Sequence, residues 1–198
     1  MIPDWLYRKC EITEDELYNI RKELIPHLKD LCPGIATLPP QLYSIKIEDL
    51  KKYSPTLCNF LQRLNLLDRW TFACFLLGNN NLENKWKIHV DDPLLNRCFA
   101  LNIPLMYCRD TYTVWYDVKD RKKSNEVKIN SQLDKLSDAY PGPEYFTPDQ
   151  CVEIGRLEAS QCAFVNITVP HVPEINHNKL RINLSLRFWP ELFDYLDK

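Results

Sequence analysis

The segment from Leu180 to Phe188 constrains the fold more than any other part of the chain, because apolar and polar residues alternate through it without interruption. In an extended strand, successive side chains point to opposite faces. The apolar face would consist of Leu180, Ile182, Leu184, Leu186 and Phe188, and the polar face of Arg181, Asn183, Ser185 and Arg187. This pattern is typical of a β-strand with one face against a hydrophobic core, so the chain is expected to build at least one sheet.

A second alternating segment, from Lys85 to Asp91, contains the first candidates for chemistry. His89 and Asp91 would share one face of this strand, with Ile88 and Val90 on the other. Residues two apart on a strand are separated by roughly 6.6 Å along the chain. An imidazole and a carboxylate placed in this way could ligate the same metal ion.

His171 precedes the strand of Arg181 and supplies a third candidate ligand. Two histidines and one aspartate form the facial triad that binds non-haem Fe(II) and leaves positions open for a co-substrate and O₂. The other two histidines are expected to be structural. His27 follows Pro26 inside a predicted helix, and His177 lies between two asparagines in a predicted turn.

Composition limits the remaining possibilities. A chain of 198 residues with 45% hydrophobic content is long enough for one domain and short for two. Only four glycines are present, and none forms a phosphate-binding loop, which argues against the common kinds of nucleotide-dependent chemistry. The net charge of −2 provides no overall field that would favour nucleic acid or an anionic membrane.

The sequence also predicts a soluble, intracellular protein of the cytoplasm without membrane association. No apolar run is long enough to cross a bilayer, and the start of the chain carries Asp4 where a signal peptide would carry lysine or arginine. The eight cysteines contain no Cys-x-x-Cys pair and no zinc-finger spacing. Most of them are therefore expected to be reduced, buried side chains.

We expect residues 1–198 to form a single domain with three regions. Residues 1–68 would form a mostly helical packing layer, and residues 69–188 a β-barrel core. Residues 189–198 would form a short C-terminal helix, in which Pro190 occupies an early position. The long polar stretch 119–150, inserted in the core region, is interpreted as a lid or substrate-gating loop.

Local signals place the individual elements. A capping box at Thr13–Glu16 starts the first helix, Pro26 is expected to kink it, and Ser54 caps a second helix. Four strands then follow one another through short turns, which favours antiparallel pairing over alternating strand and helix units. Strand character returns at Ala159 to Val169.

Several of these segments resemble the Fe(II)- and 2-oxoglutarate-dependent oxygenases, and among them the aspartyl/asparaginyl β-hydroxylase-like domains. The resemblance covers roughly residues 70 to 188. It is carried by Trp86 to Asp91, by Arg97 with Asn102 to Leu105, by Pro170-His171 and by Arg181 to Phe188. It implies a mainly β fold with flanking α-helices, namely a double-stranded β-helix. This is a jelly-roll or cupin-like barrel of two antiparallel sheets with iron at its open end.

The resemblance also implies residue roles. His89, Asp91 and His171 would be the catalytic residues, as ligands of Fe(II). Arg181 would pair with the distal carboxylate of 2-oxoglutarate, which agrees with the cost of an inward-facing arginine that meets no anion. The candidates for co-substrate binding are Arg181, Ser185, Arg97 and Asn102.

The implied reaction uses O₂ and converts 2-oxoglutarate to succinate and CO₂ while a peptide side chain or small metabolite is hydroxylated. Presence of Asp91 favours hydroxylation, because halogenases of this type leave that ligand position to halide. Two departures from the family pattern are visible. Asn183 stands where many members have serine, and the vertebrate-type aspartyl hydroxylases lack the carboxylate ligand that Asp91 would provide.

Other interpretations remain open at this point. The chain could be a non-catalytic binding module with the same fold, or a nucleic-acid oxidative demethylase, although the net charge and the absence of a basic face count against the latter. Arg181 could instead face solvent and pair with Glu158 or Asp149. Arg187 is expected to face solvent near the end of its strand.

Overall fold

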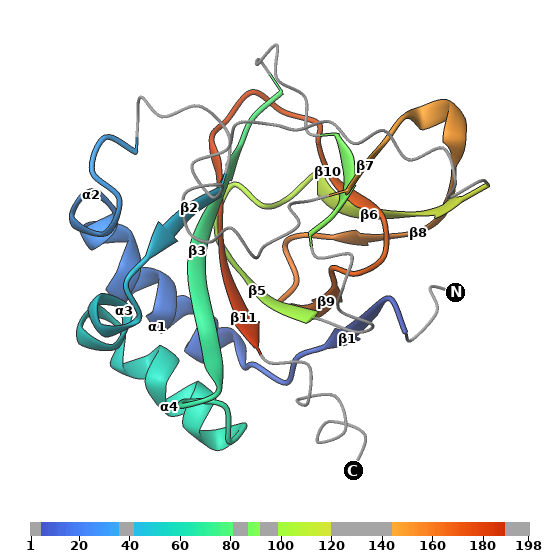
Figure 1. Cartoon of the computed structure of the whole chain (residues 1–198). Helices are drawn as coiled ribbons and strands as arrows, with labels where there is room; N and C mark the ends of the chain where they lie inside the picture. The colour runs from blue at the N-terminus through green and yellow to red at the C-terminus, as the bar shows by residue number, and fades with distance from the viewer. Residues whose placement is uncertain (1–4, 36–41, 81–86, 92–98, 120–143, 189–198) are drawn as a thin grey trace, which may run out of the picture.

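The computed structural model describes residues 5–35, 42–80, 87–91, 99–119 and 144–188. Its strands form two antiparallel sheets that face each other (Figure 1). Residues of both sheets line a cavity. The six-stranded sheet has the order β1 (Tyr7–Lys9), β9 (Ala163–Asn166), β5 (Phe99–Met106), β11 (Arg181–Phe188), β3 (Trp70–Gly78) and β2 (Leu42–Ile45). The five-stranded sheet has the order β7 (Glu144–Phe146), β4 (Ile88–Val90), β10 (His171–Ile175), β6 (Thr111–Val118) and β8 (Cys151–Glu158).

From β3 to β6, and again from β8 to β11, successive strands alternate between the two sheets. β3 and β5 lie in the six-stranded sheet while β4 and β6 lie in the five-stranded one, and β9, β10 and β11 alternate in the same way. The predicted antiparallel pairing is therefore confirmed, but apart from β3 with β2 these strands pair with strands distant in sequence rather than with their neighbours along the chain. This winding is that of a double-stranded β-helix, as the resemblance implied.

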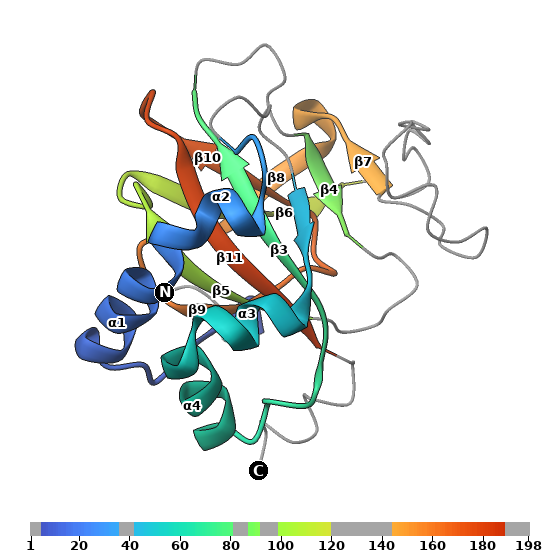
Figure 2. The same cartoon turned by 90° about the vertical axis from the view of Figure 1, so that its left-hand side faces the viewer.

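The amino-terminal helices cover the outer face of the six-stranded sheet (Figure 2). The helix α1 (Glu14–Leu24) begins at the predicted capping box, in which the Glu16 backbone donates to the Thr13 hydroxyl. A 3₁₀ turn at Ile25–His27 then separates α1 from α2 (Leu28–Leu31). The break predicted at Pro26 is thus confirmed, since proline cannot donate the next helical hydrogen bond.

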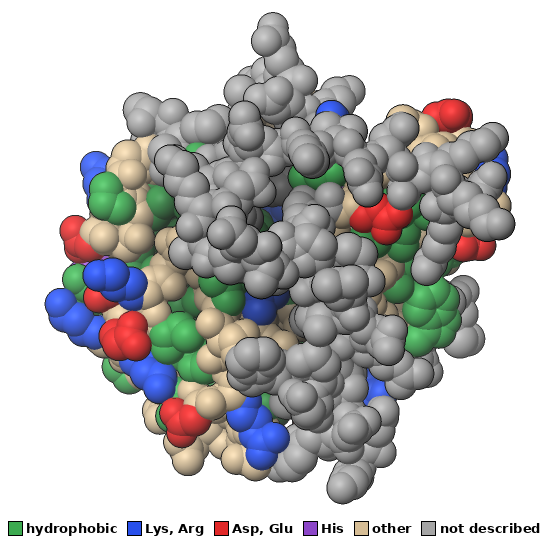
Figure 3. All heavy atoms as spheres, in the orientation of Figure 1, with side chains coloured by type: hydrophobic (Ala, Val, Ile, Leu, Met, Phe, Trp, Pro, Cys, Tyr) green, Lys and Arg blue, Asp and Glu red, His purple; other side chains and the backbone are tan. Residues whose placement is uncertain are grey.

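Two further helices complete this layer, one predicted and one missed. Ser54 caps α4 (Pro55–Arg63), as predicted. The helix α3 (Ile47–Tyr53) follows β2 directly and was not predicted. The sequence feature that indicates α3 is its charge pattern. Acidic residues occupy its first turn and lysines its last turn, where they complement the helix dipole. On the described part of this layer, Lys and Arg side chains are interspersed with Asp and Glu (Figure 3).

The outer face of β11 forms the core with these helices. Leu184 and Leu186 are fully buried and belong to the same apolar cluster as Ile20 and Leu24 of α1 and Phe60 of α4. The alternation that predicted this face is therefore confirmed. The polar face of the same strand is buried too, because it points into the space between the sheets.

Shortening Leu184 to alanine is expected to lower the free energy of unfolding by about 3 kcal/mol, because it leaves a cavity between the sheet and the helices. Val152→Ala is a suitable control, because Val152 is 48% exposed and its truncation should change the stability by less than about 0.5 kcal/mol. Chemical denaturation of both variants measures the difference. Equal stabilities would contradict the packing of β11 against the helical layer.

The strand predicted at Ala159 to Val169 is wrong at its start. β8 already begins at Cys151, and a turn follows it in which the Gln161 backbone donates to the Glu158 carbonyl at 3.3 Å. β9 begins only at Ala163. Alternation alone did not reveal this turn, because it contains neither glycine nor proline.

Several predicted features lie outside the described residues. These are the C-terminal helix at 189–198, most of the predicted lid at 119–150, and the side chains of Trp86 and Arg97. The described end of the lid region contains β7 and a 3₁₀ turn at Pro148–Gln150. Among the described residues, no helix is both long and apolar enough to cross a membrane.

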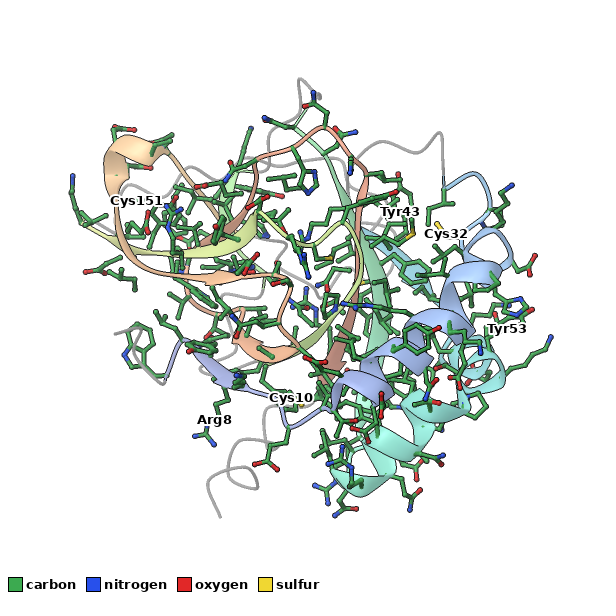
Figure 4. All side chains as sticks on the ribbon, turned by 180° about the vertical axis from the view of Figure 1, so that it is seen from behind. Arg8, Cys10, Cys32, Tyr43, Tyr53 and Cys151 are labelled. Atoms are coloured by element: carbon green, nitrogen blue, oxygen red, sulfur yellow. The ribbon has the colours of Figure 1, made fainter. Side chains whose placement is uncertain are left out.

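The described cysteines are free thiols, and all of them except Cys58 are buried, as the sequence predicted. Figure 4 shows Cys10, Cys32 and Cys151 in well separated parts of the fold, at the start of the helical layer, near β2 and at the start of β8. They therefore serve as small apolar side chains in different packing regions.

Candidate metal and co-substrate site

The three candidate metal ligands converge at one point of the five-stranded sheet. His89 on β4 and His171, the first residue of β10, are directly paired across the two strands, and their ring centroids lie 4.7 Å apart. Asp91 follows β4 immediately. One donor atom from each residue lies within 4.8 Å of the others, and both histidines are buried. Residues far apart in the sequence thus form the predicted cluster.

Backbone carbonyls orient both imidazole rings. His89 Nδ1 lies 2.7 Å from the Lys87 carbonyl, and His171 Nδ1 lies 2.9 Å from the Val169 carbonyl. A carbonyl only accepts hydrogen bonds, so each Nδ1 must carry the proton. The Nε2 atoms are therefore the ones available to a metal, which is the arrangement that metal-binding histidines commonly show.

The electrostatics of the cluster place two of its three groups, Asp91 and His171, in the charge states that metal ligation requires. Burial, and then the neighbouring His89, lower the pKa of His171 to about 4, so this ring is neutral. Burial alone would raise the pKa of Asp91, but Arg187 and His89 hold it far below its ordinary value. Burial opposes protonation of His89, yet its hydrogen bond and charge interaction with Asp91 raise its pKa. A carboxylate and an uncharged imidazole are thus present before any metal binds.

Arg187 belongs to this cluster, and the expectation that it faces solvent is wrong. Its Nη2 lies 2.7 Å from Asp91 Oδ2, while His89 Nε2 lies 3.1 Å from Asp91 Oδ1. The side chain of Arg187 is only 14% exposed. The reason is that the polar face of β11 points between the sheets along its whole length, and Arg187 has the same strand parity as Arg181.

The rest of this polar face carries buried groups that lack partners among the described residues. Ser185 Oγ, both polar atoms of the Asn183 amide and Asn102 Oδ1 make no hydrogen bond there. Asn102 on β5 is paired directly with Ser185 across the strands. Buried polar groups in folded proteins nearly always have partners. Of these residues Asn102 lines the cavity beside Arg181, where a polar ligand or ordered water would satisfy its oxygen.

Arg181 is the strongest of these signals. It is 3% exposed and lines the same cavity as His89, Asp91 and His171, and none of the described carboxylates lies within ion-pair distance of it. Burial lowers the pKa of its guanidinium, although contact with Cys108 opposes this. The alternative in which Arg181 faces solvent and pairs with Glu158 or Asp149 is therefore wrong. A guanidinium in this position is costly unless an anion neutralises it.

Of the other residues considered in the sequence, one candidate lies outside the described structure and two histidines are structural. Arg97 lies outside the described residues. His177 is bonded through Nε2 to the Tyr107 carbonyl at 2.9 Å, and His27 stacks on Tyr53 in the helical layer. Both are structural, as predicted. Asn183 was predicted to lie on the polar face with Arg181 but was not among the candidates for co-substrate binding, and the structure buries it on that face.

Comparison with known proteins establishes the fold. No family profile matches the sequence, and no curated protein is similar to it. HygX from Streptomyces hygroscopicus, whose crystal structure contains nickel and 2-oxoglutarate, aligns with a TM-score of 0.54 and 12% identity over 94% of this chain and 84% of HygX. SnoK, a non-haem α-ketoglutarate-dependent carbocyclase from nogalamycin biosynthesis, aligns with a TM-score of 0.54 and 14% identity over 93% of this chain and 80% of SnoK. The predicted double-stranded β-helix is thereby confirmed.

Proposed function

We propose that this protein is a non-haem Fe(II)- and 2-oxoglutarate-dependent dioxygenase that uses O₂ to hydroxylate a small organic molecule or a peptide side chain. The observation that carries the proposal is the buried, unneutralised Arg181 in the same cavity as a His-Asp-His cluster. A metal ion and a dianionic co-substrate would together satisfy both features. HygX, which has the same fold, has a crystal structure with nickel and 2-oxoglutarate bound.

The donor set fits ferrous iron. One carboxylate oxygen and two imidazole nitrogens match the facial triad, and their donor atoms are already gathered within 4.8 Å. In such enzymes, Fe(II) with 2-oxoglutarate activates O₂ for substrate oxidation. Oxidative decarboxylation of the co-substrate yields succinate and CO₂.

The protein's own residues would bind and orient the reactants. His89, Asp91 and His171 would hold the metal on one side only, because all three come from the five-stranded sheet. Arg181, from the opposite sheet, would pair with the distal carboxylate of 2-oxoglutarate through charge-assisted hydrogen bonds. Asn183, Ser185 and Asn102 would donate to or accept from the co-substrate, which would satisfy their polar groups.

A small molecule is the substrate class that the structural neighbours favour, because SnoK acts in the biosynthesis of nogalamycin. The closer similarity to aspartyl/asparaginyl β-hydroxylase-like domains, and with it a peptide substrate, remains a prediction from sequence. Hydroxylation as the outcome rests on Asp91, which occupies the ligand position that a halogenase would leave open.

The proposal is tested by titrating 2-oxoglutarate into the protein with and without Mn(II), a stand-in for Fe(II) that does not react with O₂. Binding is expected only with the metal present. The Fe(II)-loaded protein should then convert 2-oxoglutarate to succinate slowly in air, even without its own substrate. If neither metal-dependent binding nor succinate formation is observed, the protein is a binding module that shares the fold, and the dioxygenase assignment is wrong.

A further inference from the structure

The two side-chain oxygens of Asp91 have different partners. Oδ1 lies 3.1 Å from His89 Nε2, on the side where the candidate ligand atoms meet. Oδ2 lies 2.7 Å from Arg187 Nη2. The arginine and the carboxylate are only 14% and 21% exposed, so solvent screens this ion pair far less than a surface pair.

The side chain of each candidate ligand contacts one further group that fixes its orientation. Lys87 and Val169 hold the two imidazoles through their carbonyls. The Asp91 backbone donates to the Ile167 carbonyl at 3.2 Å, which fixes its main chain, but only Arg187 fixes the outer oxygen of its side chain in the described structure. Unlike the carbonyls of Lys87 and Val169, Arg187 lies on a strand of the six-stranded sheet, the same strand as Arg181.

We propose that Arg187 is a positioning residue that keeps Asp91 a one-oxygen ligand, so that the coordination position a second carboxylate oxygen would occupy stays open for the co-substrate. This inference rests on the proposed function. A carboxylate can bind a metal through one oxygen or through both. Three ligand atoms leave three positions of an octahedral ion open, whereas a two-oxygen aspartate would leave only two. A chelating 2-oxoglutarate and O₂ together need three.

The same contact connects the two halves of the site. Asp91 belongs to the five-stranded sheet that carries the metal ligands, and Arg187 to the strand that carries the co-substrate anchor. A residue that holds one metal ligand from the opposite sheet would therefore also fix the distance between the metal and Arg181. Partners of metal ligands typically change metal affinity or activity by about 10- to 100-fold when they are removed.

The test uses Co(II) as a probe, because its visible absorption changes with the number of ligands around the ion. We expect Arg187→Met to change the absorption spectrum of the Co(II)-loaded protein before any 2-oxoglutarate is added. We expect the affinity of that protein for 2-oxoglutarate to fall by about tenfold, the lower end of the effect of such partner groups. Arg187→Lys keeps the charge and one donor, so its spectrum should lie closer to that of wild type than the spectrum of Arg187→Met.

Arg181→Met is the matched control, since it makes the same change on the same face of the same strand. It should weaken 2-oxoglutarate binding and leave the Co(II) spectrum unchanged. If Arg187→Met also leaves the Co(II) spectrum unchanged but weakens 2-oxoglutarate binding, Arg187 contacts the co-substrate directly and the positioning role is wrong. If wild type itself binds no Co(II), the proposed function fails instead.

If Arg187→Met does not fold, a crystal structure of the metal-loaded wild-type protein tests whether Asp91 binds the metal through one oxygen. Asp91 is expected to ligate through Oδ1, with Oδ2 still within hydrogen-bond distance of Arg187. An Asp91 that binds the metal through both oxygens in wild type overturns the inference.

Discussion

Replacing His171 with alanine is expected to weaken binding of a single Fe(II) or Mn(II) ion by at least about a hundredfold. Removing a residue that only hydrogen-bonds to a metal ligand already lowers metal affinity or activity by about 10- to 100-fold, and His171 is itself a candidate ligand. His171 supplies one of three donor atoms, and its ring is neutral because burial, and then His89, lower its pKa to about 4. No proton has to leave His171 before it binds a metal. Titration of Mn(II), followed by its electron paramagnetic resonance signal, measures the loss.

His177→Ala is the matched control for this prediction. His177 lies between β10 and β11, and its Nε2 is bonded to the Tyr107 carbonyl outside the cluster. Its removal should leave Mn(II) affinity within about twofold of wild type, as for a residue with no contact to the ligands. If His171→Ala keeps the affinity of wild type, the assignment of the three ligands is wrong.

Two of the three candidate ligands could be placed together from the sequence because their signal is local. Strand parity placed His89 and Asp91 on one face, and the structure brings His171 directly opposite His89. Parity also separated the apolar and polar faces of β11 correctly. These predictions need only the two-residue repeat of a strand, which does not depend on where the strand lies in the fold.

The partner of Arg187 could not be predicted in this way. Its strand lies in one sheet and Asp91 in the other, so their contact depends on how the two sheets face each other. The last polar residue of an isolated strand is usually near solvent, which led to the wrong expectation. The strand pairings could not be predicted either, because β3, β4, β5 and β6 alternate between the two sheets instead of pairing with one another as hairpins.

This position of Arg187 changes its use as a control for co-substrate binding. From the sequence, Arg187→Ala would be expected to affect 2-oxoglutarate binding far less than Arg181→Ala. Because Arg187 contacts Asp91, its removal is now expected to have its own effect, through the metal ligand. Arg156 is the better control, since it is an exposed arginine paired with Glu153 and Glu174 on the outside of the barrel.

Arg181→Ala is expected to weaken binding of 2-oxoglutarate to the Mn(II)-loaded protein by at least about a hundredfold, because removing one partner of a buried charge pair costs several kcal/mol. Arg156→Ala should leave this affinity unchanged. Isothermal titration calorimetry of wild type and both variants provides the values. An unchanged affinity in Arg181→Ala would show that the anchor of the distal carboxylate lies elsewhere.

Pyruvate makes this test specific for the contact itself. It keeps the keto acid group that would chelate the metal but lacks the distal carboxylate that Arg181 would bind. Wild type should therefore bind 2-oxoglutarate much more tightly than pyruvate, and Arg181→Ala should lose most of this preference while its affinity for pyruvate stays nearly constant. The two ligands and two proteins form a cycle that isolates the pairwise interaction from any general effect of the substitution. A variant that weakens both ligands equally would instead have lost the shape of the cavity, and the buried charge of Arg181 would then need another explanation.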